Sequence, residues 1–239
     1  MSSLRHPARE ARLLASIVAL LIALTMLGGC ETTGLRGMGG SGEDRAERLA
    51  EKGEHAEAAG AYIALASEAV GIERDRLTLL AVEQWLDAGD VARARNGFNS
   101  VPRPAAGSLL AIWSTNSAAL SLYAGAADEA LGILEPMSRQ PLSDRDRLRV
   151  EALRADAWIQ KQDPKRAVQL MMQREAWISD RRGIELSRKR LWQGLLVSSP
   201  QVLRRAAETA TDPVIRGWLA IGSLAASTGQ QGVGWSNGV

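Results

Sequence analysis

Residues 85–94 read Trp-Leu-Asp-Ala-Gly-Asp-Val-Ala-Arg-Ala, and this stretch sets the pattern for most of the chain. The turn Ala88-Gly89-Asp90 separates a long segment with large apolar residues from a short segment that carries the small residue Ala94. Glycine is favoured directly after a helix because it adopts the left-handed backbone conformation without a steric penalty. The stretch therefore predicts a helical hairpin whose two helices approach closely.

The same turn recurs along the chain at a nearly constant period. Glycines at positions 53, 89 and 125 are two steps of 36 residues apart, and Asp163-Pro164 and Ser199-Pro200 follow after 38 and 36 further residues. Small residues recur four or five positions after the turns: Ala58 and Ala59, Ala94, Ala130 and Ala167. Hairpins of this kind, near 34 residues long, are typical of tetratricopeptide repeats, which stack to share one core. We therefore expect an all-α, tetratricopeptide-like helical hairpin solenoid over residues 43–228.

Other residues mark the expected helix boundaries and core. Expected N-cap residues precede four helices, and in the last three a proline follows at the first helical position: Ser143, Asp163, Ser199 and Asp212. Residues 101–107 (VPRPAAG) should interrupt the helices between the second and third hairpins. Five tryptophans fall within apolar helix stripes, so we expect them in the core: Trp85, Trp113, Trp158, Trp192 and Trp218.

The N-terminus carries a secretory pattern. A basic tip precedes an apolar run over residues 13–27, and the sequence Leu27-Gly28-Gly29-Cys30 ends it. At about 1.5 Å per residue the run reaches only ~22 Å, which is shorter than the ~30 Å hydrocarbon core of a bilayer. We therefore expect a cleaved signal peptide over residues 1–29 rather than an uncleaved anchor helix. The cleavage site lies between Gly29 and Cys30, the only cysteine in the chain, which would carry the lipid.

The residues after Cys30 predict how the protein is held. Residues 30–42 contain five glycines and form an expected flexible tether, whose typical reach is about 20 Å. Glu31 stands where an inner-membrane retention signal usually has aspartate. We therefore expect a lipid-anchored protein on the periplasmic face of the outer membrane.

Composition argues against several classes of function. Removing the three arginines and one glutamate of the signal from 29 basic and 27 acidic residues leaves 26 of each, so we expect no nucleic-acid partner. A catalytic triad would have to use His55, which falls in an expected turn. Glu83 and Asp87 have helical i, i+4 spacing, which usually indicates surface charge. We expect no enzymatic activity, no cofactor and no metal site.

The C-terminal helix carries the most specific motif. The sequence Asp-Pro-Val-Ile-Arg-Gly-Trp-Leu-Ala spans residues 212–220, and its signature residues are Arg216, Gly217, Trp218 and Leu219. With the lipidation motif and the hairpins, it resembles the penicillin-binding protein activator family of outer-membrane lipoproteins. The resemblance implies a non-catalytic regulator of peptidoglycan synthesis that stimulates a class A penicillin-binding protein. In that family a second domain, with a periplasmic-binding-protein fold, makes most of the partner contact, and the protein reaches through peptidoglycan.

The chain departs from this family at its C-terminus. Residues 229–239 form a glycine-rich tail, which we interpret as the start of a linker to a second domain. The preceding helix is apolar, whereas a repeat array should end in a polar capping helix. We therefore expect the sequence to be a truncated part of a longer protein. The alternative is a different tetratricopeptide periplasmic scaffold lipoprotein, which serves outer-membrane assembly or secretion and holds an extended peptide.

Overall fold

The computed structural model describes residues 42–228. Within this range there are eleven α-helices and no β-strand, which confirms the expected all-α class. The helices are α2 (Gly42–Lys52), α3 (His55–Glu68), α4 (Gly71–Asp87), α5 (Val91–Asn99), α6 (Gly107–Tyr123), α7 (Ala127–Met137), α8 (Asp144–Gln160), α9 (Pro164–Glu175), α10 (Arg181–Leu196), α11 (Pro200–Thr209) and α12 (Pro213–Ser227). The expected signal peptide, Gly29, Cys30 and the tail over residues 229–239 lie outside the described residues.

Four helix pairs, α2–α3, α4–α5, α6–α7 and α8–α9, are closed by the same turn. One residue of each turn has a positive φ angle: Gly53 (84°), Gly89 (78°), Gly125 (78°) and Gln162 (62°). The residue after it donates its N–H to the carbonyl five positions earlier, over 2.8 or 2.9 Å: Glu54 to Leu49, Asp90 to Trp85, Ala126 to Ser121 and Asp163 to Trp158. This is the Schellman arrangement that satisfies the last carbonyls of a helix. The first four positions of the period seen in the sequence are thus occupied by the same turn, whereas the fifth, Ser199-Pro200, has no residue at positive φ.

Small side chains allow the paired helices to approach each other. The alanines that recur after the turns are all fully buried: Ala58, Ala59, Ala94, Ala130 and Ala167. Large aliphatic side chains of the preceding helices fill the remaining space, among them Leu79, Leu80 and Leu86 of α4. Each fully buried leucine contributes roughly 1.5–3 kcal/mol of hydrophobic stabilisation. The division into small and large faces is therefore confirmed.

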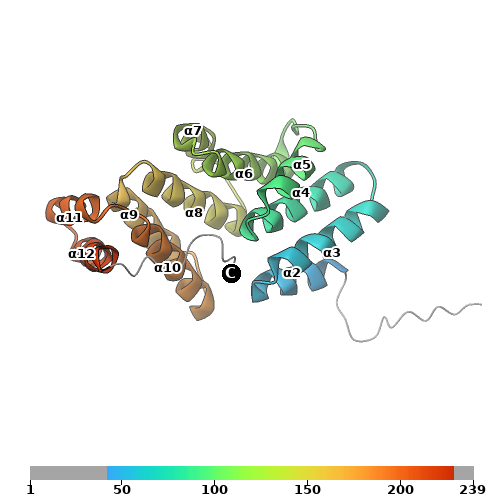
Figure 1. Cartoon of the computed structure of the whole chain (residues 1–239). Coiled ribbons are helices and arrows are strands. Elements are labelled where there is room, and N and C mark those ends of the chain that lie inside the picture. Colours follow the sequence, from blue (N-terminus) through green and yellow to red (C-terminus); the bar gives the residue numbers. More distant parts are fainter. Residues whose placement is uncertain (1–41, 229–239) are drawn as a thin grey trace, which may run out of the picture. The chain divides into compact units, whose positions relative to one another are not determined.

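The helices are arranged in two layers (Figure 1). Helix α4 packs on α6, α6 on α8, and α8 on α10, so these four helices form one layer. Helices α5, α7 and α9 form the other layer, and each packs against the helix before it and the helix after it in the chain. Residues from distant parts of the sequence consequently meet on the layer that contains α4, α8 and α10.

The last three helices are connected differently. Helix α11 packs against α9 and α12, and α12 also packs against α9 and α10. Leu195, Leu203 and Leu219, one from each of these helices, are fully buried in a common core. The side chain of Asp212 caps α12 by accepting from two backbone N–H groups. Ser199 also stands at an N-cap position, but its side chain makes no capping hydrogen bond.

The other expected caps and the expected break are present. Ser143 and Asp163 accept hydrogen bonds from the first turns of α8 and α9, as predicted. The predicted break over residues 101–107 is also present, between the end of α5 at Asn99 and the start of α6, except that Gly107 already begins α6.

The five tryptophans expected in the core are only partly buried. Indole rings are too large for the narrow space between closely packed helices, so they lie at the edges of the core, and arginines cover two of them. The guanidinium of Arg166 lies 4.3 Å from the ring centre of Trp158, and that of Arg103 lies 5.6 Å from the ring centre of Trp113. Cation–π contacts of this kind add to the burial of the ring. The prediction that these five tryptophans lie in the core was therefore only partly correct, because each is partly rather than fully buried.

Candidate functional site

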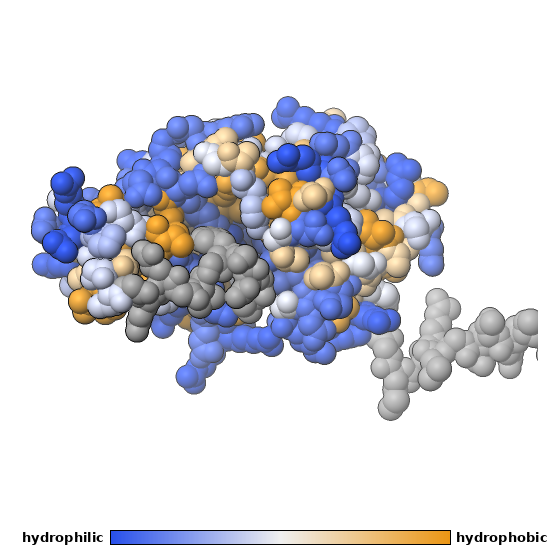
Figure 2. Space-filling model, viewed as in Figure 1, coloured by the Kyte–Doolittle hydropathy of each residue, from blue (hydrophilic) through white to orange (hydrophobic). Residues whose placement is uncertain are grey.

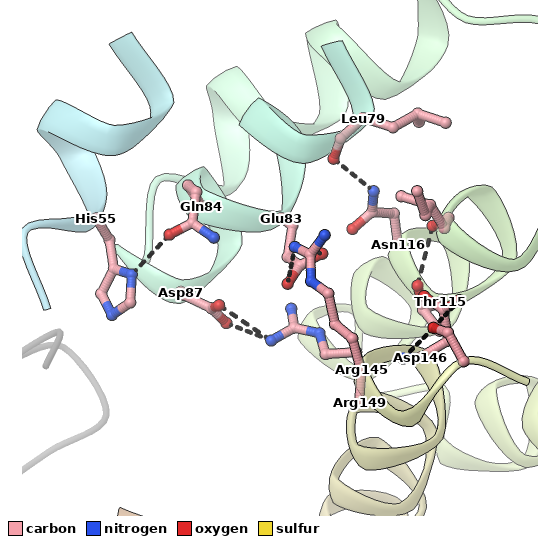
Figure 3. A network of polar contacts seen from close by, with 12 residues as sticks. His55, Leu79, Glu83, Gln84, Asp87, Thr115, Asn116, Arg145, Asp146 and Arg149 are labelled. Carbon is pink, nitrogen blue, oxygen red and sulfur yellow. Dashed lines mark hydrogen bonds and ion pairs between the residues drawn. The ribbon is translucent and has the colours of Figure 1, made fainter. Parts of the chain in front are cut away.

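Two acidic residues of α4 are paired with two arginines of α8 (Figure 3). Glu83 lies 3.3 Å from Arg145, and Asp87 accepts two hydrogen bonds from Arg149 over 2.8 and 3.0 Å. Both pairs join residues 62 positions apart. They match in register because the acids are one helical turn apart on α4 and the arginines are one turn apart on α8. Glu83 and Asp87 are therefore not free surface charges, and the sequence-based expectation was wrong.

The reason is the layer packing: α4 and α8 both pack on α6, and the long arginine side chains of α8 reach the acids of α4. The side chains of Glu83 and Asp87 are 13% and 24% exposed, and that of Arg149 is 13% exposed. Burial alone raises the pKa of Asp87, but the positive charges of Arg149 and Arg190 outweigh it and lower that pKa. Asp87 is thus held as a carboxylate in a partly desolvated position.

A third pair extends the cluster to α10. Arg190 forms an ion pair with Asp156 of α8, and both side chains are less than one third exposed. The hydroxyl of Tyr123 donates to the carbonyl of Leu86, which lies next to Asp87 in the chain. Burial, and then the charge of Asp87, raise the pKa of Tyr123. Tyr123 thus places a neutral hydroxyl among these ion pairs.

Among the described residues, one arginine in this region has no carboxylate in hydrogen-bond contact. The Nε atom of Arg174 donates to the carbonyl of Leu148 over 3.0 Å, and its Nη1 atom is buried without a partner among the described residues. Burial, and then the positive charge of Arg190, lower the pKa of Arg174 to about 10. Arg174 is therefore a buried cation that lies among charges of both signs, including Asp156 and Glu175.

These residues define the ion-pair cluster, which we take as the candidate functional site: Glu83, Asp87, Arg145, Arg149, Asp156, Arg174 and Arg190. It contains four cations and three anions drawn from α4, α8, α9 and α10. Guanidinium groups bind carboxylates and phosphates in a fixed, often bidentate geometry. The chemistry available at the cluster is therefore recognition of a polar or anionic partner group.

His55 lies at the edge of this region. It is the first residue of α3, and its Nδ1 atom lies 2.9 Å from the Oε1 atom of the buried Gln84 (Figure 3). This contact links α3 to α4. The contacts of His55 in the described part of the chain thus join it to an amide rather than to a hydroxyl or a thiol.

The sequence-predicted site residues on α12 do not form one site. Arg216 is exposed, and a side chain on Gly217 would meet nothing within 4 Å. Trp218 is half-buried, with its ring centre 6.4 Å from that of Trp192, and Leu219 is fully buried. The signature therefore combines two residues that build the core with two that face outward. Cys30 and Gly29, which carry the expected lipidation and cleavage, lie outside the described residues.

Two shallow grooves occur at the C-terminal end of the described chain. One, of about 470 Å³, lies between α9 and the start of α12 and is lined by Lys165, Gln169, Met172, Asp212 and Ile215, among others. The other, of about 300 Å³, lies between α11 and α12 and includes Leu224. Neither groove contains residues of the ion-pair cluster.

Residues 42–228 contain neither of two other kinds of site. No group of three histidine, cysteine, aspartate or glutamate residues in this range is arranged to hold a metal ion. No helix in the same range combines the length and apolarity needed to cross a bilayer.

Comparison with known proteins gives no family. No protein-family model matches the chain, and no curated protein and no solved structure is detectably similar to it. Inference about its function rests on its own residues.

Sequence reasoning missed the ion-pair cluster. A signal was nevertheless present, since the acid pair at positions 83 and 87 and the arginine pair at 145 and 149 have the same i, i+4 spacing. Two helices with matching spacing of opposite charge can pair in register once they lie side by side.

Proposed function

We propose that this chain belongs to an outer-membrane lipoprotein that regulates peptidoglycan synthesis by binding and activating a class A penicillin-binding protein, without catalysing a reaction itself. The observation that carries the proposal is the lipidation motif ending at Cys30, placed ahead of an all-helical domain that ends in the Arg216–Leu219 motif. Such an arrangement holds a binding domain at a membrane surface. The lipid retains it there, because several acyl chains together make membrane attachment effectively permanent.

In this proposal the four regular hairpins form a tetratricopeptide-like solenoid. The repeated turn and the buried alanines support it, because both recur with the period of the hairpins. Solenoids of this type bind partners along the layer formed by the first helix of each hairpin. The residues that α4 and α8 contribute to the ion-pair cluster lie on that layer, and in this proposal the cluster supplies the contact surface of this chain.

The test is binding of the lipidated protein to a purified class A synthase of the same bacterium, together with the rate of glycan polymerisation. We expect binding and a faster rate. Replacing Arg145, whose side chain is 51% exposed within the cluster, by alanine should weaken binding about tenfold. Arg181→Ala removes a 93% exposed arginine outside the cluster and should change nothing. No binding at about 50 µM protein, a concentration at which even weak complexes form, would contradict the proposal.

The alternative is a periplasmic scaffold for outer-membrane assembly or secretion. Arg174 favours it, because its Nη1 atom is buried without a partner among the described residues and a guanidinium can bind a carboxylate of an extended acidic segment. Co-purification of the lipidated protein with a β-barrel or secretin complex, combined with no binding to the synthase, would support this second function.

A further inference from the structure

The connection between α3 and α4 exposes two large apolar side chains. Val70 is 83% exposed and Ile72 is 76% exposed, which makes them the most exposed large hydrophobic residues of the described chain. Gly71 between them has a φ angle of 60° and open space around it. Figure 2 shows apolar surface at the margin where this connection lies. We call Val70, Gly71 and Ile72 the α3–α4 tip.

The sharp reversal at the tip keeps these side chains outside the core. Val70 is the N-cap residue of α4 and has an extended backbone, with no side-chain cap. A polar N-cap would satisfy one of the free N–H groups of the helix, and Val70 gives up that stabilisation. An apolar residue where a polar one is preferred, next to a second exposed apolar residue, indicates a surface that contacts an apolar phase.

The tip lies at the end of the domain where the chain enters from Cys30. A Cβ atom built on Gly42, the first residue of α2, would lie only 2.7 Å from Leu65 in the last turn of α3. Arg76 of α4 donates two hydrogen bonds of 2.7 Å to Glu43 of α2. These contacts fix the start of α2 beside the end of α3 and the start of α4.

The length of chain between the lipid and the domain sets how far the tip can be from the membrane. Gly42 follows the expected lipidated Cys30 by 12 residues. A glycine-rich segment of this length typically spans about 20 Å and cannot exceed roughly 43 Å. The lipid therefore confines this end of the domain to the neighbourhood of the bilayer surface.

We propose that the α3–α4 tip inserts Val70 and Ile72 into the bilayer that holds the lipid of Cys30, as a second membrane contact of the domain. The inference rests on the lipid anchor of the proposed function. The second contact fixes the orientation of the α3–α4 hairpin, which a single flexible tether cannot do.

The charges around the tip specify the kind of lipid. Glu68 and Glu73 flank the tip on either side, with Arg74 next to Glu73, and all three are exposed. The local charge thus gives no net attraction to anionic headgroups, and insertion depends on apolar burial. We therefore expect the contact to be as strong on zwitterionic phosphatidylcholine or phosphatidylethanolamine vesicles as on vesicles containing anionic lipid.

The test uses a single environment-sensitive label on the lipidated protein. Lipidation blocks Cys30, so Ile72→Cys supplies one free thiol for a nitrobenzoxadiazole fluorophore. In phosphatidylcholine vesicles we expect a blue-shifted emission that is quenched by nitroxide groups on the lipid tails. A matched label at Ile221→Cys, on α12 and 61% exposed, should remain in water.

A second substitution tests the contribution of the neighbouring side chain. Val70→Ser in the labelled Ile72→Cys protein should reduce the inserted fraction, with about a tenfold lower insertion equilibrium from the lost valine. Equal quenching with and without Val70→Ser would mean that the fluorophore inserts by itself, and would overturn the proposal.

The remaining outcomes distinguish a failure of the tip proposal from a failure of the lipid anchor. If the protein floats with the vesicles and takes up one label, but the label at position 72 stays in water, the tip proposal is wrong while the anchor stands. The same holds if the emission is blue-shifted but nitroxide groups on the lipid tails do not quench it, which would indicate contact with a second copy of the chain. If the Ile72→Cys protein takes up two labels and does not float, Cys30 carries no lipid and both proposals fail.

Discussion

Helices α2–α9 and helices α10–α12 are held together in different ways. In the first region four hairpins are closed by one repeated turn with a residue at positive φ. In the second region proline follows an N-cap residue at the start of α11 and of α12, and the described chain between α10 and α12 contains no residue at positive φ. There the helices are held together by the buried leucines Leu195, Leu203 and Leu219.

The difference shows which interactions make the hairpins of the first region repeat regularly. A Schellman turn is local, so a few residues specify it wherever they occur. The position of α12 against both α9 and α10 depends instead on side chains that are far apart in the sequence. Substitutions should therefore have moderate and similar effects at the turns, and large effects at the core of the second region.

The largest expected effect is at Leu219. Leu219→Ala should lower the free energy of unfolding by about 3 kcal/mol, because it removes a fully buried side chain and leaves a cavity. Urea unfolding followed by circular dichroism measures the change. Ile221→Ala, on the same helix but 61% exposed, is the control and should cost less than about 1 kcal/mol. Equal effects of the two substitutions would mean that α12 does not form part of the core.

The next effect is at the ion-pair cluster, which connects helices of the first region to α10. Asp87→Asn should cost about 2 kcal/mol, because Arg149 is left 13% exposed without its carboxylate. A double-mutant cycle with Arg149→Met isolates the pairwise contribution, since the two effects should not add. Strict additivity would show that the pair contributes nothing to stability.

The pH dependence of stability provides an independent measure of the same pair. The pKa of Asp87 is lower in the folded protein than its ordinary value, so the folded state favours the carboxylate. Its stabilising contribution is present above about pH 4, the pKa of an unfolded aspartate, and is lost as the pH falls through the lower folded value. The wild type should therefore lose more stability than Asp87→Asn between pH 5 and pH 3. Parallel pH profiles of the two proteins would contradict this.

Much of the first region could be predicted from the sequence, and the candidate site could not. The turns at Gly53, Gly89 and Gly125 follow from local residue preferences, and so does the burial of alanines such as Ala94. The pairing of Asp87 with Arg149 depends on how two hairpins stack around a third. No local rule sets that register, and the i, i+4 spacing of the acids of α4, taken alone, predicts solvated charges.

The four turns also allow a comparison of residues in one backbone conformation. Gln162 has a φ angle of 62°, where the other three turns have glycine. Gln162→Gly should stabilise the protein by about 1 kcal/mol, because it removes the steric cost of a side chain at positive φ. Gly125→Ala, at 78° and with open space around it, should destabilise by about the same amount. Thermal unfolding measures both, and shifts of the same sign would show that turn conformation does not control stability.

The smallest expected effect on stability is at Arg216. This substitution is informative because it contrasts with the large effect expected at Leu219. Arg216 shares the α12 motif with Leu219, but its side chain is exposed, and no ion pair with it occurs among the described residues. Arg216→Ala should change the free energy of unfolding by less than about 0.5 kcal/mol, as expected for a surface substitution.

If the same variant binds the class A synthase as well as the wild type does, the whole motif is explained by packing of α12. If binding weakens while stability stays constant, Arg216 belongs to the contact surface. The motif then has two parts, since Leu219 positions the helix and Arg216 faces the partner.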